Sequence, residues 1–208
     1  MFESPLADGA LKTARKGLGR FVLRVEGRAA HAGVEPEKGI SAALEIAHQA
    51  LRINALNAWD LGTTVNVGII HAGTRANVVA AAAEAEVDVR VARADEAERV
   101  LKALYGLTPA LDGSLLSVEG GLHRPPMERI PATAALYARA RAIAASMGVE
   151  LGEGIGGGSD GNFTAALGLG TLDGLGPEGA GAHATHEQVL VESLPRRAAL
   201  AAGLLAEL

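Results

Sequence analysis

The stretch from Gly154 to Gln188 contains residue types and spacings suited to chemistry. Its first feature is the run 156–162, GGGSDGN, in which three consecutive glycines let the backbone approach a ligand because no Cβ stands in the way. Ser159 or Asp160 is placed to cap a helix after the run, and a helix N-terminus offers free N–H groups and a positive dipole end to an anion. No Gly-Lys-Ser/Thr follows, so the run is not a phosphate loop.

The second feature is His183-Ala-Thr-His-Glu187, which follows a loop of Gly, Pro and Ala. A histidine on a glycine-rich loop after a short strand, expected over 170–175, is well placed to reach a metal ion. The sequence has no cysteine, so any zinc would be held by histidine and carboxylate side chains. Taken alone, both features are weak, because glycine runs are usually plain loops and a lone histidine is more often structural or exposed than a ligand.

A further set of polar side chains has both an ordinary and a chemical interpretation: Glu3, His31, Asn77, Arg90 and Arg124. From residue type alone, the histidine and the asparagine fit turn chemistry, the arginines fit surface charges and the glutamate fits a frayed terminus. The arginines also have the planar fork that binds a carboxylate through two parallel hydrogen bonds.

These motifs, in this order, resemble the M20 family of di-zinc aminoacyl hydrolases, which includes glutamate carboxypeptidases, acetylornithine deacetylase, succinyl-diaminopimelate desuccinylase and aminoacylases. Besides the glycine run, the matching motifs are Phe-Glu-Ser-Pro at 2–5, Ala-His-Ala-Gly at 30–33, Gly-x-x-x-Asn-Val-Val at 73–79, Asp-x-Arg at 88–90, Arg-Pro at 124–125 and His-x-x-x-Glu at 183–187. The resemblance covers nearly all 208 residues, but only the latter part of the family's chain.

The resemblance implies zinc-dependent hydrolysis of an amide bond in a small peptide or N-acyl amino acid, with release of an amino acid such as C-terminal glutamate. His183 and Glu3 would be zinc ligands, and a complete site in the family holds two zinc ions. The resemblance implies that His31 binds the substrate's carbonyl oxygen and Asn77 binds the substrate, both across a homodimer. Arg90 and Arg124 would bind the substrate's carboxylate. The backbone of Gly157 and Gly158 would bind its main chain and the oxyanion.

Several motifs of the family are missing from this sequence. It contains no His-x-Asp and no Glu-Glu pair, which supply the other metal ligands and the general base in the family. We therefore expect a truncated form that is inactive by itself. Two alternatives stay open: a non-catalytic dimerisation or regulatory module derived from such an enzyme, and an N-acyl amino acid deacylase similar to acetylornithine deacetylase or the desuccinylase.

The hydrophobic periodicity predicts the elements that must position these residues. Alternation typical of half-buried strands occurs over 19–30, 63–70, 80–93 and 114–119, and helical spacing occurs from Gly39 to about 54–57 and after Asp95. The resulting order β-α-β-β-α-β is that of a ferredoxin-like domain. One face of its sheet would carry both helices.

The predicted fold class is therefore α/β (α+β), with a ferredoxin-like dimerisation domain inserted in, and followed by, part of an α/β zinc-hydrolase catalytic domain. We place the end of a catalytic-domain strand and a Pro- and Gly-containing linker at 1–16, the dimerisation domain at 17–121 and the C-terminal part of the catalytic domain at 122–208. Within the last part we expect helices over 132–147 and 190–208, with Glu187 starting the last one, and a short strand within 148–155.

Composition excludes several other classes of protein. Hydrophobic residues make up 49% of the sequence, enough for a real core, and the net charge of −5 comes from acids and bases mixed along the chain. This pattern predicts neither a nucleic-acid partner nor a membrane anchor. No apolar run reaches the roughly 18 residues of a membrane span. We expect a cytoplasmic protein, and a signal peptide stays open because the natural N-terminus is not in view.

Overall fold

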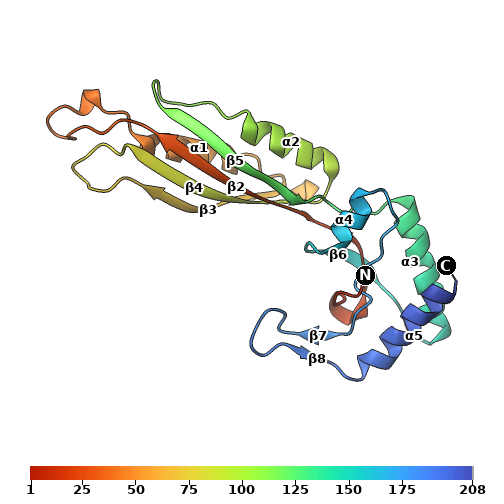
Figure 1. Ribbon diagram of the computed structural model, residues 1–208. Helices are drawn as coiled ribbons and strands as arrows, with labels where there is room; N and C mark the ends of the chain where they lie inside the picture. The colour runs from red at the N-terminus through yellow and green to blue at the C-terminus, as the bar shows by residue number, and fades with distance from the viewer. Residues whose placement is uncertain (208) are drawn as a thin grey trace. The chain divides into compact units, whose positions relative to one another are not determined.

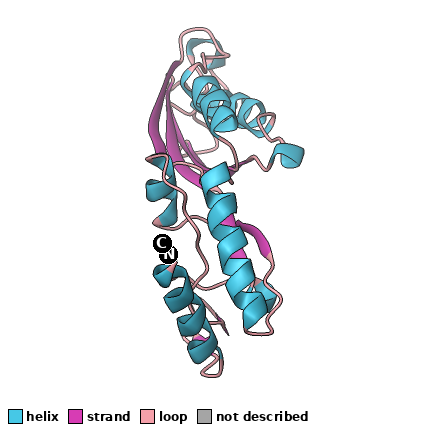
Figure 2. Ribbon diagram, turned by 90° about the vertical axis from the view of Figure 1, so that its right-hand side faces the viewer, coloured by secondary structure: helices cyan, strands magenta, loops and turns pink. Residues whose placement is uncertain are grey.

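The chain folds into two compact units, which a computed structural model describes for residues 1–207 (Figure 1). Unit 1 consists of Met1–Lys16 and Arg124–Leu208, and unit 2 of Gly17–His123. Both units contain helices and strands (Figure 2). No helix among the described residues is long and apolar enough to span a bilayer.

Unit 2 has the predicted ferredoxin-like order. Its strands are β2 (Gly17–Glu26), β3 (Thr64–Ala72), β4 (Ala82–Val91) and β5 (Leu115–Arg124), and its helices are α1 (Ala42–Asn54) and α2 (Ala94–Tyr105). The four strands form one sheet in the order β3-β4-β2-β5, in which β4 pairs antiparallel with both β2 and β3 (Figure 1). Short 3-10 helices, Pro36–Lys38 and Trp59–Leu61, lie in two of its loops.

The alternation along β2 determines which face of the sheet is buried. Phe21, Leu23 and Val25 are buried in a core that also contains apolar side chains of β4, α1 and α2. The intervening Arg20 and Arg24 lie on the opposite face, where they pair with Glu86 and Glu84 of β4. Both helices therefore cover one face, as predicted, while the other is open and charged.

Strand β5 is longer than the predicted segment 114–119. It continues past Gly120, whose φ of 122° belongs to the left-handed region that favours glycine. A Cβ at this position would lie 2.2 Å from the carbonyl oxygen of Arg20. Gly120 thus allows β5 to pass close to the neighbouring strand and to reach Arg124.

Unit 1 combines two small sheets of two strands each with helices. Strand β1 (Leu11–Arg15) pairs parallel with β6 (Glu153–Gly156), and β7 (Gly179–Ala180) pairs antiparallel with β8 (Gln188–Val189). The helices are α3 (Pro131–Ser146), α4 (Gly161–Ala166) and α5 (Ser193–Ala206), and a 3-10 turn spans Ala7–Gly9. Leu11, Tyr137, Leu172, Leu200 and Leu204 belong to a shared core.

Three local predictions for unit 1 were wrong. In the segment 1–16, where the end of a strand followed by a linker was expected, the strand β1 lies at the place of the linker and is buried along most of its length. The segment 170–175 is extended, but it is joined to β1 only by an isolated bridge between Lys12 and Asp173. The last helix begins at Ser193, so Glu187 precedes β8 and does not start the helix. Position 208, at the end of that predicted helix, lies outside the described residues.

Candidate substrate-binding site

The glycine run lies between β6 and α4, and a buried asparagine holds it through hydrogen bonds. The Asn162 side chain is fully buried, and its Oδ1 accepts a hydrogen bond from the Ser159 N–H at 2.8 Å. Its Nδ2 donates to the carbonyl oxygens of Pro125 at 2.7 Å and Lys16 at 3.2 Å. One amide group therefore connects the run to the segments that follow β1 and β5.

A buried ion pair supports the same run. The Arg15 Nε lies 2.7 Å from Asp173 Oδ2, and the two side chains are 3% and 0% exposed. Asp173 also accepts hydrogen bonds from the Ser159 hydroxyl at 2.7 Å and from the Gly174 N–H at 2.6 Å. Burial alone would raise the pKa of Asp173, but these hydrogen bonds and the Arg15 charge outweigh it, so the pKa lies below its usual value.

The run does not create the helix-dipole site that the sequence suggested. Helix α4 has only six residues, and the Asp160 side chain makes no capping hydrogen bond. Ser159 takes this part instead, because its Oγ accepts a hydrogen bond from the Gly161 N–H at 3.1 Å. Any ligand at the run would therefore meet individual backbone N–H groups rather than the dipole of a long helix.

Arg124 lies against the glycine run. Its guanidinium carbon is 5.4 Å from the centre of the Phe163 ring, and its Nη2 is 3.3 Å from Asp160 Oδ1. The Arg124 Nε is buried and has no hydrogen-bond partner within residues 1–207. Arg124 thus contacts Asp160 of the same run that contains the predicted substrate-binding residues Gly157 and Gly158.

His31 and Asn77 meet at one end of unit 2, although they lie far apart in the sequence. His31 forms a bridge with Val78, and the Ala32 N–H donates to the Asn77 carbonyl at 3.0 Å. The His31 Nδ1 accepts a hydrogen bond from the Gly33 N–H at 3.2 Å. In the neutral imidazole the proton is then on Nε2, which is free to donate to an oxygen of a ligand.

Arg90 lies on the open face of the unit 2 sheet. Its Nε and Nη2 donate to the two oxygens of Asp88 at 2.7 and 3.0 Å, which raises the pKa of the guanidinium. The hydrogen bonds to Asp88 use one side of the planar fork, and Nη1 has no hydrogen-bond partner in the described part of the chain. A ligand carboxylate would approach Arg90 at this end of the guanidinium.

The two predicted zinc ligands lie in unit 1. Glu3 is exposed, and its backbone carbonyl accepts a hydrogen bond from the Gly176 N–H at 2.9 Å. His183 is exposed on the loop between β7 and β8, with a left-handed φ of 66°, and its N–H donates to Glu187 at 3.3 Å. Such a φ is uncommon for a residue other than glycine and occurs often at functional positions.

These side chains do not make a complete zinc centre. Zinc sites in proteins are usually formed by at least three protein ligands around each ion. Residues 1–207 contain no group of three or more His, Asp or Glu side chains that could hold a metal ion. The residues present therefore do not fit a two-zinc site, and no catalytic step is assigned to a metal held by this chain alone.

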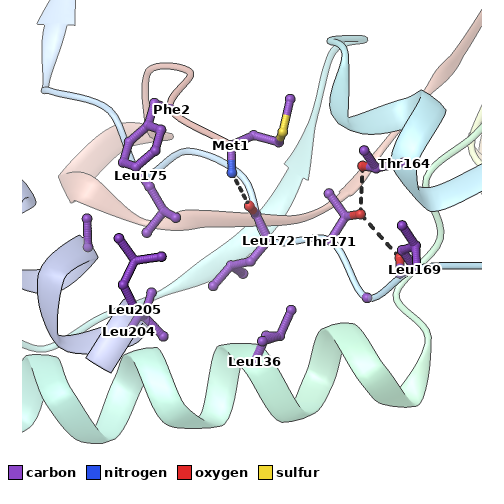
Figure 3. A pocket seen from close by; sticks show the side chains of 12 residues that line it. Met1, Phe2, Leu136, Thr164, Leu169, Thr171, Leu172, Leu175, Leu204 and Leu205 are labelled. Atoms are coloured by element: carbon purple, nitrogen blue, oxygen red, sulfur yellow. Dashed lines mark hydrogen bonds between the residues drawn. The ribbon is translucent and has the colours of Figure 1, made fainter. Parts of the chain in front are cut away.

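Unit 1 also has an apolar pocket of about 330 Å³, which none of these predicted site residues lines (Figure 3). Leucines of α3, α5 and the 169–175 segment line it together with Met1 and Phe2. Its polar side chains are Thr164 and Thr171, whose hydroxyls lie 2.8 Å apart. The pocket has no acidic or basic side chain, so its lining suits apolar packing and not acid–base chemistry.

The buried residues that support the run, Arg15, Asn162 and Asp173, were not identified as important from the sequence. Arginine and aspartate are rarely fully buried unless they are paired, and their partners lie far away along the chain. The only local signal is Asn162 itself, which ends the GGGSDGN motif.

Comparisons with known proteins show what this chain is similar to. Residues 13–110 match the family model of the M20 peptidase dimerisation domain. The chain is 29% identical over 209 residues to carboxypeptidase G2 of Pseudomonas sp. (strain RS-16), covering 97% of this chain and 50% of the relative. It is 35% identical over 99 residues to one of the p-aminobenzoyl-glutamate hydrolase polypeptides of Escherichia coli (strain K12), covering 42% of this chain and 23% of the relative.

Among solved structures, the aminopeptidase PepT of Bacillus cereus superposes with a TM-score of 0.82 at 26% identity. The match covers 99% of this chain and 56% of that one. The chain therefore spans about half the length of the Pseudomonas and Bacillus proteins that it matches along nearly its whole length.

Proposed function

Because this chain belongs to the M20 peptidase family, we propose that it provides the substrate-binding side of an enzyme that hydrolyses an amide bond and releases an amino acid such as C-terminal glutamate. The observation that carries the proposal is the position of the Arg124 guanidinium, 3.3 Å from Asp160 of the glycine run. Arg124 would hold the free carboxylate of the substrate, and the backbone at Gly157 and Gly158 would bind its main chain. Two relatives, carboxypeptidase G2 and p-aminobenzoyl-glutamate hydrolase, have names that fit a glutamate-releasing activity.

The polar residues of unit 2 extend this proposal. Arg90 would contact a carboxylate through the end of its guanidinium, and Asn77 would contact the substrate across the homodimer. His31 would donate from Nε2 to the carbonyl oxygen as negative charge develops there. Hydrogen bonds to a developing oxyanion stabilise the transition state more than the substrate, and for that reason they accelerate the reaction.

Metal use needs side chains besides those of this chain, because residues 1–207 contain no complete group of metal ligands. M20 enzymes are metallopeptidases, and His183 and Glu3 are our candidates for two zinc ligands. Zinc would supply an activated water molecule for attack on the amide. The remaining ligands and a general base would have to come from sequence that the relatives contain and this chain does not match.

A homodimer through unit 2 is the proposed assembly. Strand β3 is an edge strand with exposed Ile69 and Ile70, and it packs beside α1. Helix α1 exposes Leu44 and Leu51, which are 51% and 72% accessible. An open sheet edge next to exposed leucines is suited to pairing with a second copy.

Binding calorimetry with p-aminobenzoyl-L-glutamate tests the proposed function directly. The wild-type chain should bind this ligand, and Arg124→Met should weaken binding about tenfold or more because a charged hydrogen bond is lost. Arg129→Met is the matched control, because Arg129 also pairs with an exposed carboxylate in unit 1, that of Glu153. The chain alone with added zinc should show no hydrolysis.

Two results of this experiment would count against the proposal. The first is no binding by the wild-type chain, and the second is equal binding by the Arg124→Met and Arg129→Met proteins. Replacing the ligand by N-acetyl-L-ornithine separates the deacylase alternative, which predicts tighter binding of that compound than of the glutamate conjugate.

A further inference from the structure

The peptide plane between Gly157 and Gly158 needs an external restraint to keep one orientation. Neither glycine has a Cβ, so steric limits on rotation of this plane are weak. The chain has no cis peptide bond within the described residues, and in a trans peptide the C=O and N–H groups point in opposite directions. Whatever fixes the Gly157 carbonyl therefore also fixes the direction of the Gly158 N–H.

Arg15 holds that carbonyl. Its Nη1 donates a hydrogen bond to the Gly157 oxygen, and its Nε is fixed by Asp173. The backbone of Arg15 is held equally firmly, because its N–H and C=O both bond to Met127, at 2.9 and 3.0 Å. The Arg15 guanidinium is thus fixed in place and holds the Gly157 carbonyl by a hydrogen bond.

The other side of the same peptide is open. The Gly158 N–H has no hydrogen-bond partner anywhere in the described part of the chain. No heavy atom lies within 4 Å of the position that a Cβ on Gly157 would take. The Gly157 carbonyl points toward the Arg15 guanidinium, so the Gly158 N–H of the same trans peptide points away from it. This unpaired N–H, at a partly exposed residue, is available to an acceptor oxygen of a ligand.

We propose that Arg15 is a positioning residue, which orients the Gly157–Gly158 peptide so that the Gly158 N–H faces the ligand. Asp173 takes part by neutralising the buried guanidinium and by accepting a hydrogen bond from the hydroxyl of Ser159, the residue that follows the peptide. Loss of Arg15 would let the peptide rotate, and in the rotated form a carbonyl oxygen would face the ligand where a donor is needed. The identity of the ligand rests on the proposed function, but the orientation of the peptide does not.

Stability alone does not explain this arrangement. The Arg15 Nη2 is buried and has no hydrogen-bond partner within residues 1–207, which is unfavourable for a polar atom. Replacing a buried ion pair by uncharged side chains of similar size is often neutral or stabilising. A buried arginine with one unused nitrogen is therefore better explained by the carbonyl that it holds.

Residual dipolar couplings of the backbone amides measure the orientation of this peptide in solution. The test variant is the double substitution Arg15→Met and Asp173→Asn, which removes both charges together so that neither is left buried alone. Arg15→Lys is the second variant, because it keeps a charge beside Asp173 and lacks the second nitrogen that reaches Gly157. Arg129→Met is the control, and the Gly168 amide is the internal reference.

In the wild-type chain, we expect one sharp Gly158 resonance whose coupling fits the orientation described above. In the double variant, the coupling should collapse and the resonance should broaden or split, while Gly168 is unchanged. Binding of p-aminobenzoyl-L-glutamate should weaken about tenfold, the effect expected for one lost hydrogen bond to a ligand oxygen. Arg15→Lys should give a smaller change in the same direction.

An unchanged Gly158 coupling in both variants would overturn the inference, because another group would then fix the peptide. Failure of the wild-type chain to bind the ligand would count against the proposed function instead. The coupling of the ligand-free protein still decides the role of Arg15 in that case.

Discussion

Glu96 of α2 provides a quantitative test of how unit 2 is stabilised. Its side chain is almost fully buried and accepts hydrogen bonds from Arg99, at 2.7 Å on each oxygen, and from the Thr63 hydroxyl at 2.6 Å. These bonds lower the pKa of Glu96 from 4.5 to about 2. The difference between 4.5 and about 2, at ~1.4 kcal/mol for each tenfold change in proton affinity, sets an upper limit of ~3.5 kcal/mol on this contribution. Because Arg99 is partly solvated, we expect Glu96→Gln to lower the free energy of unfolding by about 2 kcal/mol.

The sign of the pH dependence follows from the direction of the shift. Because the folded pKa is lowered, the contribution of Glu96 is fully present above pH 4.5 and is lost as the pH falls toward about 2. Urea unfolding, followed by the amide signals of β3 and β4, should show a difference in unfolding free energy between wild type and Glu96→Gln. This difference should be constant above about pH 5 and narrow as the pH falls from there to about 3. Glu98→Gln, an exposed change on the same helix, should show no gap. A gap that stays constant with pH would refute the reasoning.

Three further predictions concern assembly, the glycine run and the apolar pocket. Leu51→Lys should shift the chain from dimer to monomer in light scattering. Leu115→Lys, at a comparably exposed leucine on β5, should leave the dimer intact. The opposite pattern would contradict the proposed dimer face. Asn162→Ala should lower the free energy of unfolding of unit 1 by about 2 kcal/mol, because it leaves the Ser159 N–H and two carbonyls unpaired, and urea unfolding would show it. Leu172 is almost fully buried in the pocket wall, so Leu172→Ala should lower the free energy of unfolding by about 3 kcal/mol in the same experiment. A decrease below about 0.5 kcal/mol would show that this wall is not well packed.

The fold of unit 2 could be predicted because its signals are local. Alternation of Phe21, Leu23 and Val25 with arginines marks β2, and helical spacing marks α1 and α2. The order of these elements then indicates the ferredoxin-like arrangement, which the structure confirms. Strand β1 was missed because Leu11, Lys12 and Thr13 are all buried, so no alternation marks it, and its partner β6 lies far along the chain.

The candidate site was only partly predictable for a similar reason. Arg124 and the glycines were found through motifs, and in the structure Arg124 contacts Asp160 of the glycine run. The pairing of Arg15 with Asp173 joins residues 158 positions apart, and nothing in either local sequence indicates that these charges are buried. The bridge that brings His31 beside Asn77 is also a tertiary contact. Periodicity and motifs thus identify elements and candidate residues, while the contacts between distant segments require the fold.

The most direct measurement of the central claim is an amide chemical-shift map of the chain during titration with p-aminobenzoyl-L-glutamate. We predict saturable shifts concentrated at positions 156–161 and at Arg124, with the Gly158 proton moving downfield as it donates to the ligand. Shifts confined to the apolar pocket or to the β3 edge, or no saturable shifts at all, would contradict the account.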